Sequence, residues 1–174
     1  GDYGLRHIAR GGAGAHPVIA SFTGHRPDKL GPHEPLTALA TWWLEALQPD
    51  TVISGMALGW DQAEAEAATR LGVPWCAAVP FEGQESRWPD ASRAQYRRLL
   101  ARAGSVVIVS PGGYSARKMH WRNEWMVDQS DLLCALWDGS EGGTGSCVAY
   151  AERVGRLWVN LWSEWPGAPP STPR

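Results

Sequence analysis

The sequence lacks several features that mark particular classes of protein. It has only three cysteines in 174 residues, Cys76, Cys134 and Cys147, and none forms a C-x-x-C pair. We therefore expect reduced, buried thiols rather than a disulfide framework or a cysteine-type zinc site. No apolar run reaches the roughly 18 residues of a membrane-spanning helix, and no basic-then-apolar start resembles a signal peptide. These absences favour a cytoplasmic protein that makes no contact with a membrane.

An excess of charge of one sign is also lacking. Sixteen Lys and Arg residues stand against 18 Asp and Glu residues, which gives a formal net charge of −2. The whole molecule therefore presents no basic field to nucleic acid, and nucleic-acid binding is not expected unless a local patch provides it. The sequence has no G-K-[ST], and the glycines around residues 142–147 lack the third Gly of G-x-G-x-x-G. NTP hydrolysis and a standard dinucleotide Rossmann site are thereby disfavoured.

Short apolar runs alternate with helical patterns along the chain. Such runs are typical of strands buried on both faces, and they occur at Val18–Phe22, Thr51–Ser54, Trp75–Val79, Ser105–Ser110, Leu132–Trp137 and Leu157–Trp162. Helices are predicted at about 36–47, 61–71, 91–103, 119–129 and 146–154. The alternation predicts one α/β domain over residues 17–164, a Rossmann-like, doubly wound, mainly parallel sheet of about six strands with helices on both faces. A Gly-rich arm at 1–16 and a Pro-rich tail at 165–174 would flank it.

Ligands of open parallel sheets bind beyond the carboxyl ends of the strands, where loops lead into helices. In the first such loop, TGHRPDKLG, Thr23 and Gly24 would let backbone N–H groups approach a ligand, and Arg26 offers a planar fork to phosphate or carboxylate. His25 is a fourth candidate ligand-binding residue, and a plain polar turn is the alternative interpretation. Because His25 and His33 have no paired carboxylate in their loops, we expect no metal site, and no cofactor is predicted.

The second loop, SGMALGWDQAEAEA, offers Ser54, Gly55, Gly59 and Asp61 as candidate ligand-binding residues. A helix beginning near Asp61 would present open backbone donors to an anion. Asp61 could cap that helix or face a ribose, and capping is the favoured interpretation. Glu64 could reach the same cleft, but an exposed helix face is favoured.

The third and fourth loops complete the predicted site. In HWRNEWMVDQSD, Arg122 and Asn123 would share a helix face and place a cation and an amide at one end of a cleft, unless the helix is an ordinary amphipathic one. In the fourth loop, glycines and hydroxyls precede a helix and would cradle a phosphate or ribose phosphate. The candidates in the fourth loop are Asp138, Gly142, Gly143, Thr144, Gly145 and Ser146.

Eleven tryptophans are many for this length. Most are expected in the core. Four lie in or beside predicted loops, where a ring could stack on a base or seal a subunit interface: Trp60, Trp88, Trp121 and Trp125.

Three segments resemble the YpsA-like branch of the SLOG superfamily, which also contains the LOG phosphoribohydrolases and the DprA DNA-processing proteins. They are TGHRP, ISGMALGWD and RNEWMVDQSDLLCALWDGSEGGTGSCVAYA, and the resemblance runs from about Val18 to Leu161. The last segment is also similar to a run of nucleoside deoxyribosyltransferases. The resemblance implies a Rossmann-like fold that binds a nucleotide or a nucleotide-derived ligand of the NAD or ADP-ribose type, as a sensor or a processing domain. It also implies self-association, since relatives commonly form homo-oligomers.

The chain departs from its hydrolase and transferase relatives at one place. In them a catalytic Glu follows the glycine–Thr loop by two or three residues, whereas here the first carboxylate after Thr144 is Glu152, about two helical turns on. Binding without turnover is therefore the first hypothesis. The second is cleavage of the N-glycosidic bond of a nucleoside monophosphate, for which another carboxylate would have to substitute: Asp61, Glu64, Glu124 or Asp138.

Overall fold

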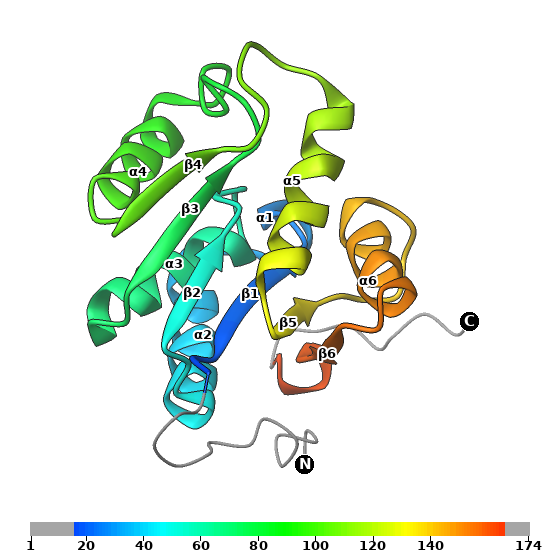
Figure 1. Ribbon diagram of the computed structural model, residues 1–174. Coiled ribbons are helices and arrows are strands. Elements are labelled where there is room, and N and C mark those ends of the chain that lie inside the picture. The colour runs from blue at the N-terminus through cyan, green and yellow to red at the C-terminus, as the bar shows by residue number, and fades with distance from the viewer. Residues whose placement is uncertain (1–15, 166–174) are drawn as a thin grey trace.

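The computed structural model describes residues 16–165, and its centre is one open sheet (Figure 1). All neighbouring strands pair in parallel, in the order β4-β3-β2-β1-β5-β6. The strands are β1 (Ile19–Gly24), β2 (Thr51–Ser54), β3 (Trp75–Val79), β4 (Ser105–Ile108), β5 (Leu132–Leu136) and β6 (Leu157–Asn160). The predicted Rossmann-like α/β fold is confirmed. The predicted arm and tail lie outside the described residues, apart from His16 and Trp165.

Helices cover both faces of the sheet (Figure 1). One face carries α1 (Pro27–Leu30), α2 (His33–Leu47), α3 (Trp60–Leu71) and α4 (Asp90–Leu100), and the other carries α5 (Ala116–Gln129) and α6 (Gly143–Arg153). Strand β5 shows why its run is apolar at every position. Leu132, Cys134 and Leu136 pack into the core under α2 and α3, while Leu133 and Ala135 pack under α5 and α6.

Strand β4 differs from the prediction for its run. It lies at the edge of the sheet, and Val106 and Ile108 are exposed. Edge strands have one neighbour instead of two, so an apolar run alone does not fix burial.

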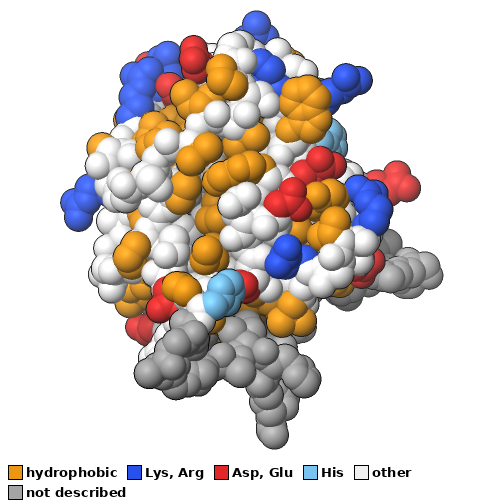
Figure 2. All heavy atoms as spheres, viewed as in Figure 1, with side chains coloured by type: hydrophobic (Ala, Val, Ile, Leu, Met, Phe, Trp, Pro, Cys, Tyr) orange, Lys and Arg blue, Asp and Glu red, His pale blue; other side chains and the backbone are white. Residues whose placement is uncertain are grey.

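Charged side chains of both signs are scattered over the face seen in Figure 2, and hydrophobic side chains form a band across its middle. Within the described residues, no helix combines the length and the apolar character needed to span a bilayer.

All five predicted helices begin earlier than the sequence predicts, and three of them do so by about three residues, including α2, which begins at His33 rather than near Leu36. Helix α5 begins at Ala116 rather than near Met119, and α6 begins at Gly143 rather than near Ser146. Part of the first predicted loop also folds into α1. Consequently the glycine–Thr segment forms the first turn of α6 instead of a loop in front of it.

Glu64 is buried, so the favoured prediction of an exposed helix face is wrong. Residues 60–68 of α3 are all buried, because this helix lies between the sheet, α2 and α4. Glu64 is 0% exposed, and neither of its carboxylate oxygens has a hydrogen-bond partner among the described residues. Burial, together with the nearby charge of Asp61, raises the pKa of Glu64 well above its ordinary value of 4.5.

We predict that Glu64→Leu stabilises the protein, and does so more at pH 8 than at pH 5. The folded state binds the Glu64 proton more tightly than the unfolded state does. The stability of the parent protein therefore falls as the pH rises above about 4.5, by up to about 1.4 kcal/mol per pH unit until the folded-state pKa is reached. Urea unfolding at the two pH values measures the difference. Glu45→Leu, on the exposed side of α2, is the control, and an equal gain for Glu64→Leu at both pH values would contradict the prediction.

Candidate functional site

A cavity of about 610 Å³ opens at the carboxyl edge of the sheet. Its walls come from the end of β1 and the segment after it, from the first turns of α3 and α6, and from the first two turns of α5. Eleven of its lining residues are among the predicted site residues: Thr23, Gly24, His25, Arg26, Asp61, Arg122, Asn123, Gly142, Gly143, Thr144 and Ser146. Segments far apart in sequence thus meet at the edge where the parallel-sheet rule places ligands.

Five predicted site residues do not line this cavity, and each of them has a contact that explains its type. Ser54 is buried, and its hydroxyl donates to the backbone carbonyl of Asp61 at 2.7 Å. Gly59 has a φ of +95°, and a Cβ there would lie 2.5 Å from the carbonyl oxygen of His25. A Cβ on Gly145 would lie 3.0 Å from the carbonyl oxygen of Ser140. These three residues shape the backbone around the cavity.

Gly55, the fourth, makes room for a buried guanidinium. Arg122 is 3% exposed and its Nη1 donates to the Gly55 carbonyl, while its Nε donates to Asn123 Oδ1 at 2.8 Å. A Cβ on Gly55 would lie 2.7 Å from Arg122 Nη1. Burial lowers the pKa of Arg122, and the carboxylate of Asp61 opposes that shift. Because α5 begins at Ala116, Arg122 lies in the second turn of its helix and not at the start.

Asp61 is a buried carboxyl group in the wall of the cavity. It is 5% exposed, and burial raises its pKa to about 6, against the opposing effects of Arg122 and of a hydrogen bond from the backbone N–H of Ala57. The favoured interpretation of Asp61 as a helix cap is wrong. Helix α3 begins at Trp60, one residue before Asp61, and its N-cap is Gly59 with no side-chain cap.

Asp138, the fifth predicted residue outside the lining, joins two loops. Its carboxylate lies 2.8 Å from His25 Nε2 and accepts hydrogen bonds from Lys29 Nζ at 3.0 Å and from the hydroxyl of Ser140 at 2.5 Å. Partial burial raises the pKa of Asp138, but the hydrogen bonds from Ser140 and Lys29 prevail and hold it well below its usual range. Burial lowers the pKa of His25, with Asp138 opposing. Asp138 therefore holds the segment after β1 against the segment before α6.

The N-terminus of α6 faces the cavity without a capping side chain. Gly142 is its N-cap, with a φ of +145°, and among residues 16–165 no side-chain hydrogen bond caps this end of the helix. Gly142, Gly143, Thr144 and Ser146 all line the cavity. The first N–H groups of a helix have no partner within the helix, and they carry the positive end of its dipole. This end of the cavity is therefore suited to an anion.

Sequence reasoning missed eight lining residues: Asp28, Lys29, Ala57, Tyr114, Ala116, Met119, His120 and Glu141. Three of them follow Ser115, the N-cap position of α5. A hydroxyl residue directly before the stretch ARKMHW is an N-cap signal, and this signal would have placed the start of the predicted helix at an earlier residue. Lys29 lies within the first predicted loop, and its contact with Asp138 could not be seen from spacing.

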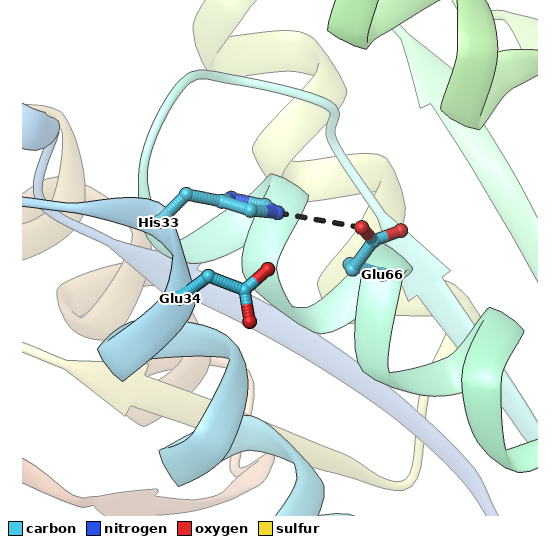
Figure 3. Close-up of side chains that lie close together, drawn as sticks. All are labelled: His33, Glu34 and Glu66. Carbon is cyan, nitrogen blue, oxygen red and sulfur yellow. Dashed lines mark ion pairs between the residues drawn. The ribbon is translucent and has the colours of Figure 1, made fainter.

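One group of possible metal ligands exists among the described residues, away from this cavity. His33, Glu34 and Glu66 each have a ligand atom within 4.8 Å of the others, and Figure 3 shows His33 and Glu66 pointing toward one another. Arg98 donates two hydrogen bonds of 3.0 Å to Glu66, and Arg70 donates to Glu34 at 2.8 Å and to Glu66 at 3.2 Å. The two arginines already balance both carboxylates, so the group is an ion-pair cluster that joins α2, α3 and α4.

We predict that Gly55→Ala destabilises the protein by about 1–3 kcal/mol, because the added methyl would displace the buried guanidinium of Arg122. Chemical denaturation measures the change. Gly113→Ala is the matched control, since its Cβ would meet no atom within 4 Å. Equal stabilities of the two variants would show that Arg122 moves aside freely.

The chain resembles known proteins in sequence over most of its length. Residues 39–154 match the model of the YpsA family, described as the YspA SLOG family. The SPbeta prophage-derived protein YoqJ of Bacillus subtilis is 33% identical over 126 residues, which are 63% of this chain and 73% of YoqJ. A UPF0398 protein of Bacillus cereus strain G9842 is 25% identical over 161 residues, which are 80% of this chain and 85% of that protein.

Solved structures share the fold. DNA processing protein A (DprA) from Streptococcus pneumoniae aligns with a TM-score of 0.61 at 18% identity over 82% of this chain, which spans 49% of that DprA chain. A protein named TM1055 aligns with a TM-score of 0.59 at 13% identity, over 88% of this chain and 76% of TM1055. The family match covers well over half of the chain and agrees with the motifs in the loops. The chain belongs to the YpsA family of SLOG proteins.

Proposed function

We propose that the cavity at the carboxyl edge binds a nucleotide or a nucleotide-derived ligand, of the nucleoside-phosphate, NAD or ADP-ribose type. One observation carries this proposal: the uncapped N-terminus of α6 faces the same cavity as the cations of Arg26 and Lys29. Backbone donors, a helix dipole and cationic side chains together recognise a phosphate. A phosphate would rest on the first turn of α6, near Gly143.

The opposite wall supplies groups suited to a ribose. Asn123 and Asp61 line the cavity together with His120, and amide and carboxylate groups are hydrogen-bonding partners for sugar hydroxyls. Arg122 holds the Asn123 side-chain oxygen at 2.8 Å, so the amide nitrogen of Asn123 is the group presented to a ligand. A pocket of this size, with a few convergent polar groups, is typical of small-molecule sites.

The missing glutamate supports binding as the primary role. Two to four residues after Thr144 the helix carries Ser146, Cys147 and Val148, none of them acidic, and the last two are buried. The first carboxylate after Thr144, that of Glu152, does not line the cavity. The acidic side chains that do line it among the described residues are Asp28, Asp61 and Glu141. A sensor or regulatory domain needs the phosphate and ribose contacts but no catalytic carboxylate.

The first test compares Gly143→Asp with Gly143→Asn. A Cβ at Gly143 would meet no atom within 4 Å, and an acidic side chain at a helix N-terminus stabilises the helix, so both variants should fold. The added carboxylate would repel a phosphate, whereas the amide of equal size would not. We expect Gly143→Asp to weaken binding of AMP, ADP-ribose or NAD at least tenfold relative to Gly143→Asn, a change of about 1.4 kcal/mol by calorimetry.

Two results would contradict this proposal. One is equal affinity of the two Gly143 variants for every nucleotide that the parent protein binds. The other is a parent protein that retains no nucleotide at all.

A second candidate function is cleavage of an N-glycosidic bond, and the burial of Asp61 in the cavity wall favours it. A carboxyl group with a pKa of about 6 is part protonated and part ionised near neutral pH. It could therefore serve as a general acid, as a base for water, or as the group that stabilises an oxocarbenium-like centre. Asp61 would then replace the glutamate that the chain lacks after Thr144.

We predict, for this second function, that Asp61→Asn abolishes release of free base while leaving nucleotide affinity within a few fold. Mass spectrometry of nucleoside monophosphates, NAD and ADP-ribose incubated with the protein would detect the base or ribose phosphate. Activity of the parent protein should change with pH around 6, the pKa of Asp61. Retained ligand without any product would assign the protein to binding alone.

A further inference from the structure

A second cavity of about 260 Å³ adjoins the first. The two share four lining residues: Arg26, Ala57, Tyr114 and Met119. The residues of the α6 N-terminus line only the first cavity, and Phe81, Trp88 and Arg87 line only the second. A molecule that reached both ends would therefore cross the shared wall at Arg26 and Tyr114.

The second cavity is lined by aromatic rings. Phe81 and Tyr114 meet at 88° with ring centroids 5.5 Å apart, and Trp88 meets Tyr96 at 89° with centroids 5.4 Å apart. In an edge-to-face pair the partner covers at most one face of a ring. Phe81 is 6% exposed and Trp88 packs partly buried against the core, whereas Tyr114 is 74% exposed. The ring of Tyr114 therefore keeps a face that can stack on a planar base.

The backbone that leads into Tyr114 is held in place, although Tyr114 itself is 74% exposed. Lys118 Nζ donates to the carbonyls of Pro111 and Gly113 at 3.0 and 2.9 Å, on the segment that leads into Tyr114. The Gly112 carbonyl accepts from the backbone N–H of Glu82 at 3.2 Å. This segment is therefore tied both to α5 and to the segment after β3. Tyr114 thus presents a mostly exposed ring, on an anchored segment, at the border of both cavities.

We propose that the second cavity is the base-binding half of a two-part site, and that the ligand is a nucleoside joined through a diphosphate to a second ribose, the ADP-ribose class. This inference rests on the proposed function of the first cavity. The base stacks on Tyr114, the diphosphate extends from Arg26 to the first turn of α6, and the terminal ribose lies near Asn123 and Asp61. At 260 Å³ the second cavity is smaller than a typical ligand site, as a subsite for one ring system should be.

The charge of the second cavity agrees with this placement. Arg87 lines it and Arg26 lies on the wall shared with the first cavity, and neither has an ion-pair partner at 4.0 Å or less among residues 16–165. Two arginines without partners can meet a diphosphate between the base and the ribose end.

The test measures the affinity of Tyr114→Ala for ADP-ribose and for ribose 5-phosphate by calorimetry. Stacking of a base on an aromatic ring is worth roughly tenfold or more in affinity. We expect Tyr114→Ala to bind ADP-ribose roughly tenfold more weakly than the parent protein and ribose 5-phosphate equally well. Tyr114→Phe, which keeps the ring, should restore ADP-ribose binding. Trp121→Ala is the matched control. Trp121 is also an exposed aromatic residue, at 46%, but it lies on α5 and lines neither cavity.

The outcomes separate the two proposals. If Tyr114→Ala leaves ADP-ribose affinity unchanged while the parent binds both ligands, the base subsite is wrong and the phosphate site stands. A parent protein that binds ADP-ribose no better than ribose 5-phosphate also overturns the subsite. If the parent binds neither of these ligands, and neither AMP nor NAD, the proposed function itself fails, and the subsite with it.

Discussion

The buried guanidinium of Arg122 is the contact on which the candidate site depends. It reaches from α5, on one face of the sheet, to the carbonyl of Gly55, which directly follows β2. It also lies close enough to Asp61 for its charge to oppose the rise that burial causes in the pKa of Asp61. A buried charge is tolerated only when it is hydrogen-bonded and near an opposite charge. Arg122 therefore needs the glycine at position 55, the carboxyl group at 61 and the amide at 123 together. This shared requirement explains why three separate segments meet beside one cavity.

Much of this arrangement could be predicted from the sequence, for identifiable physical reasons. The alternation of apolar runs and helical patterns is a local signal, and it specifies a parallel sheet whose strands end at one edge. That edge then collects Thr23, Asp61, Asn123 and Gly143 without any knowledge of tertiary contacts. Residue type was informative where backbone approach matters, since glycines allow contacts that a Cβ would block.

The failures of prediction concern burial and helix ends. Glu64 reads as a solvent-facing residue by its charge, but α3 is covered on all sides, and no local pattern reveals the number of neighbours of a helix. Asp61 reads as a cap because it precedes an alanine-rich stretch, whereas the helix begins one residue earlier. The contacts of Asp138 with His25 and Lys29 depend on β1 and β5 being neighbours, which spacing along the chain does not reveal. Tertiary packing thus decided the burial of Glu64, and the exact start of the helix decided the role of Asp61.

The order of the strands places the cavity at the border between two halves of the sheet. Chain order and sheet order agree from β1 to β4, and the chain then returns to place β5 on the other side of β1. The ladder between β1 and β5 is thus the seam between two halves of the sheet, and the cavity lies across the end of that seam. A molecule held by Arg26 on one side and by the first turn of α6 on the other would brace the seam. Opening of the seam and departure of the molecule would then be coupled, so that the residence time of the ligand and the rigidity of the sheet rise and fall together.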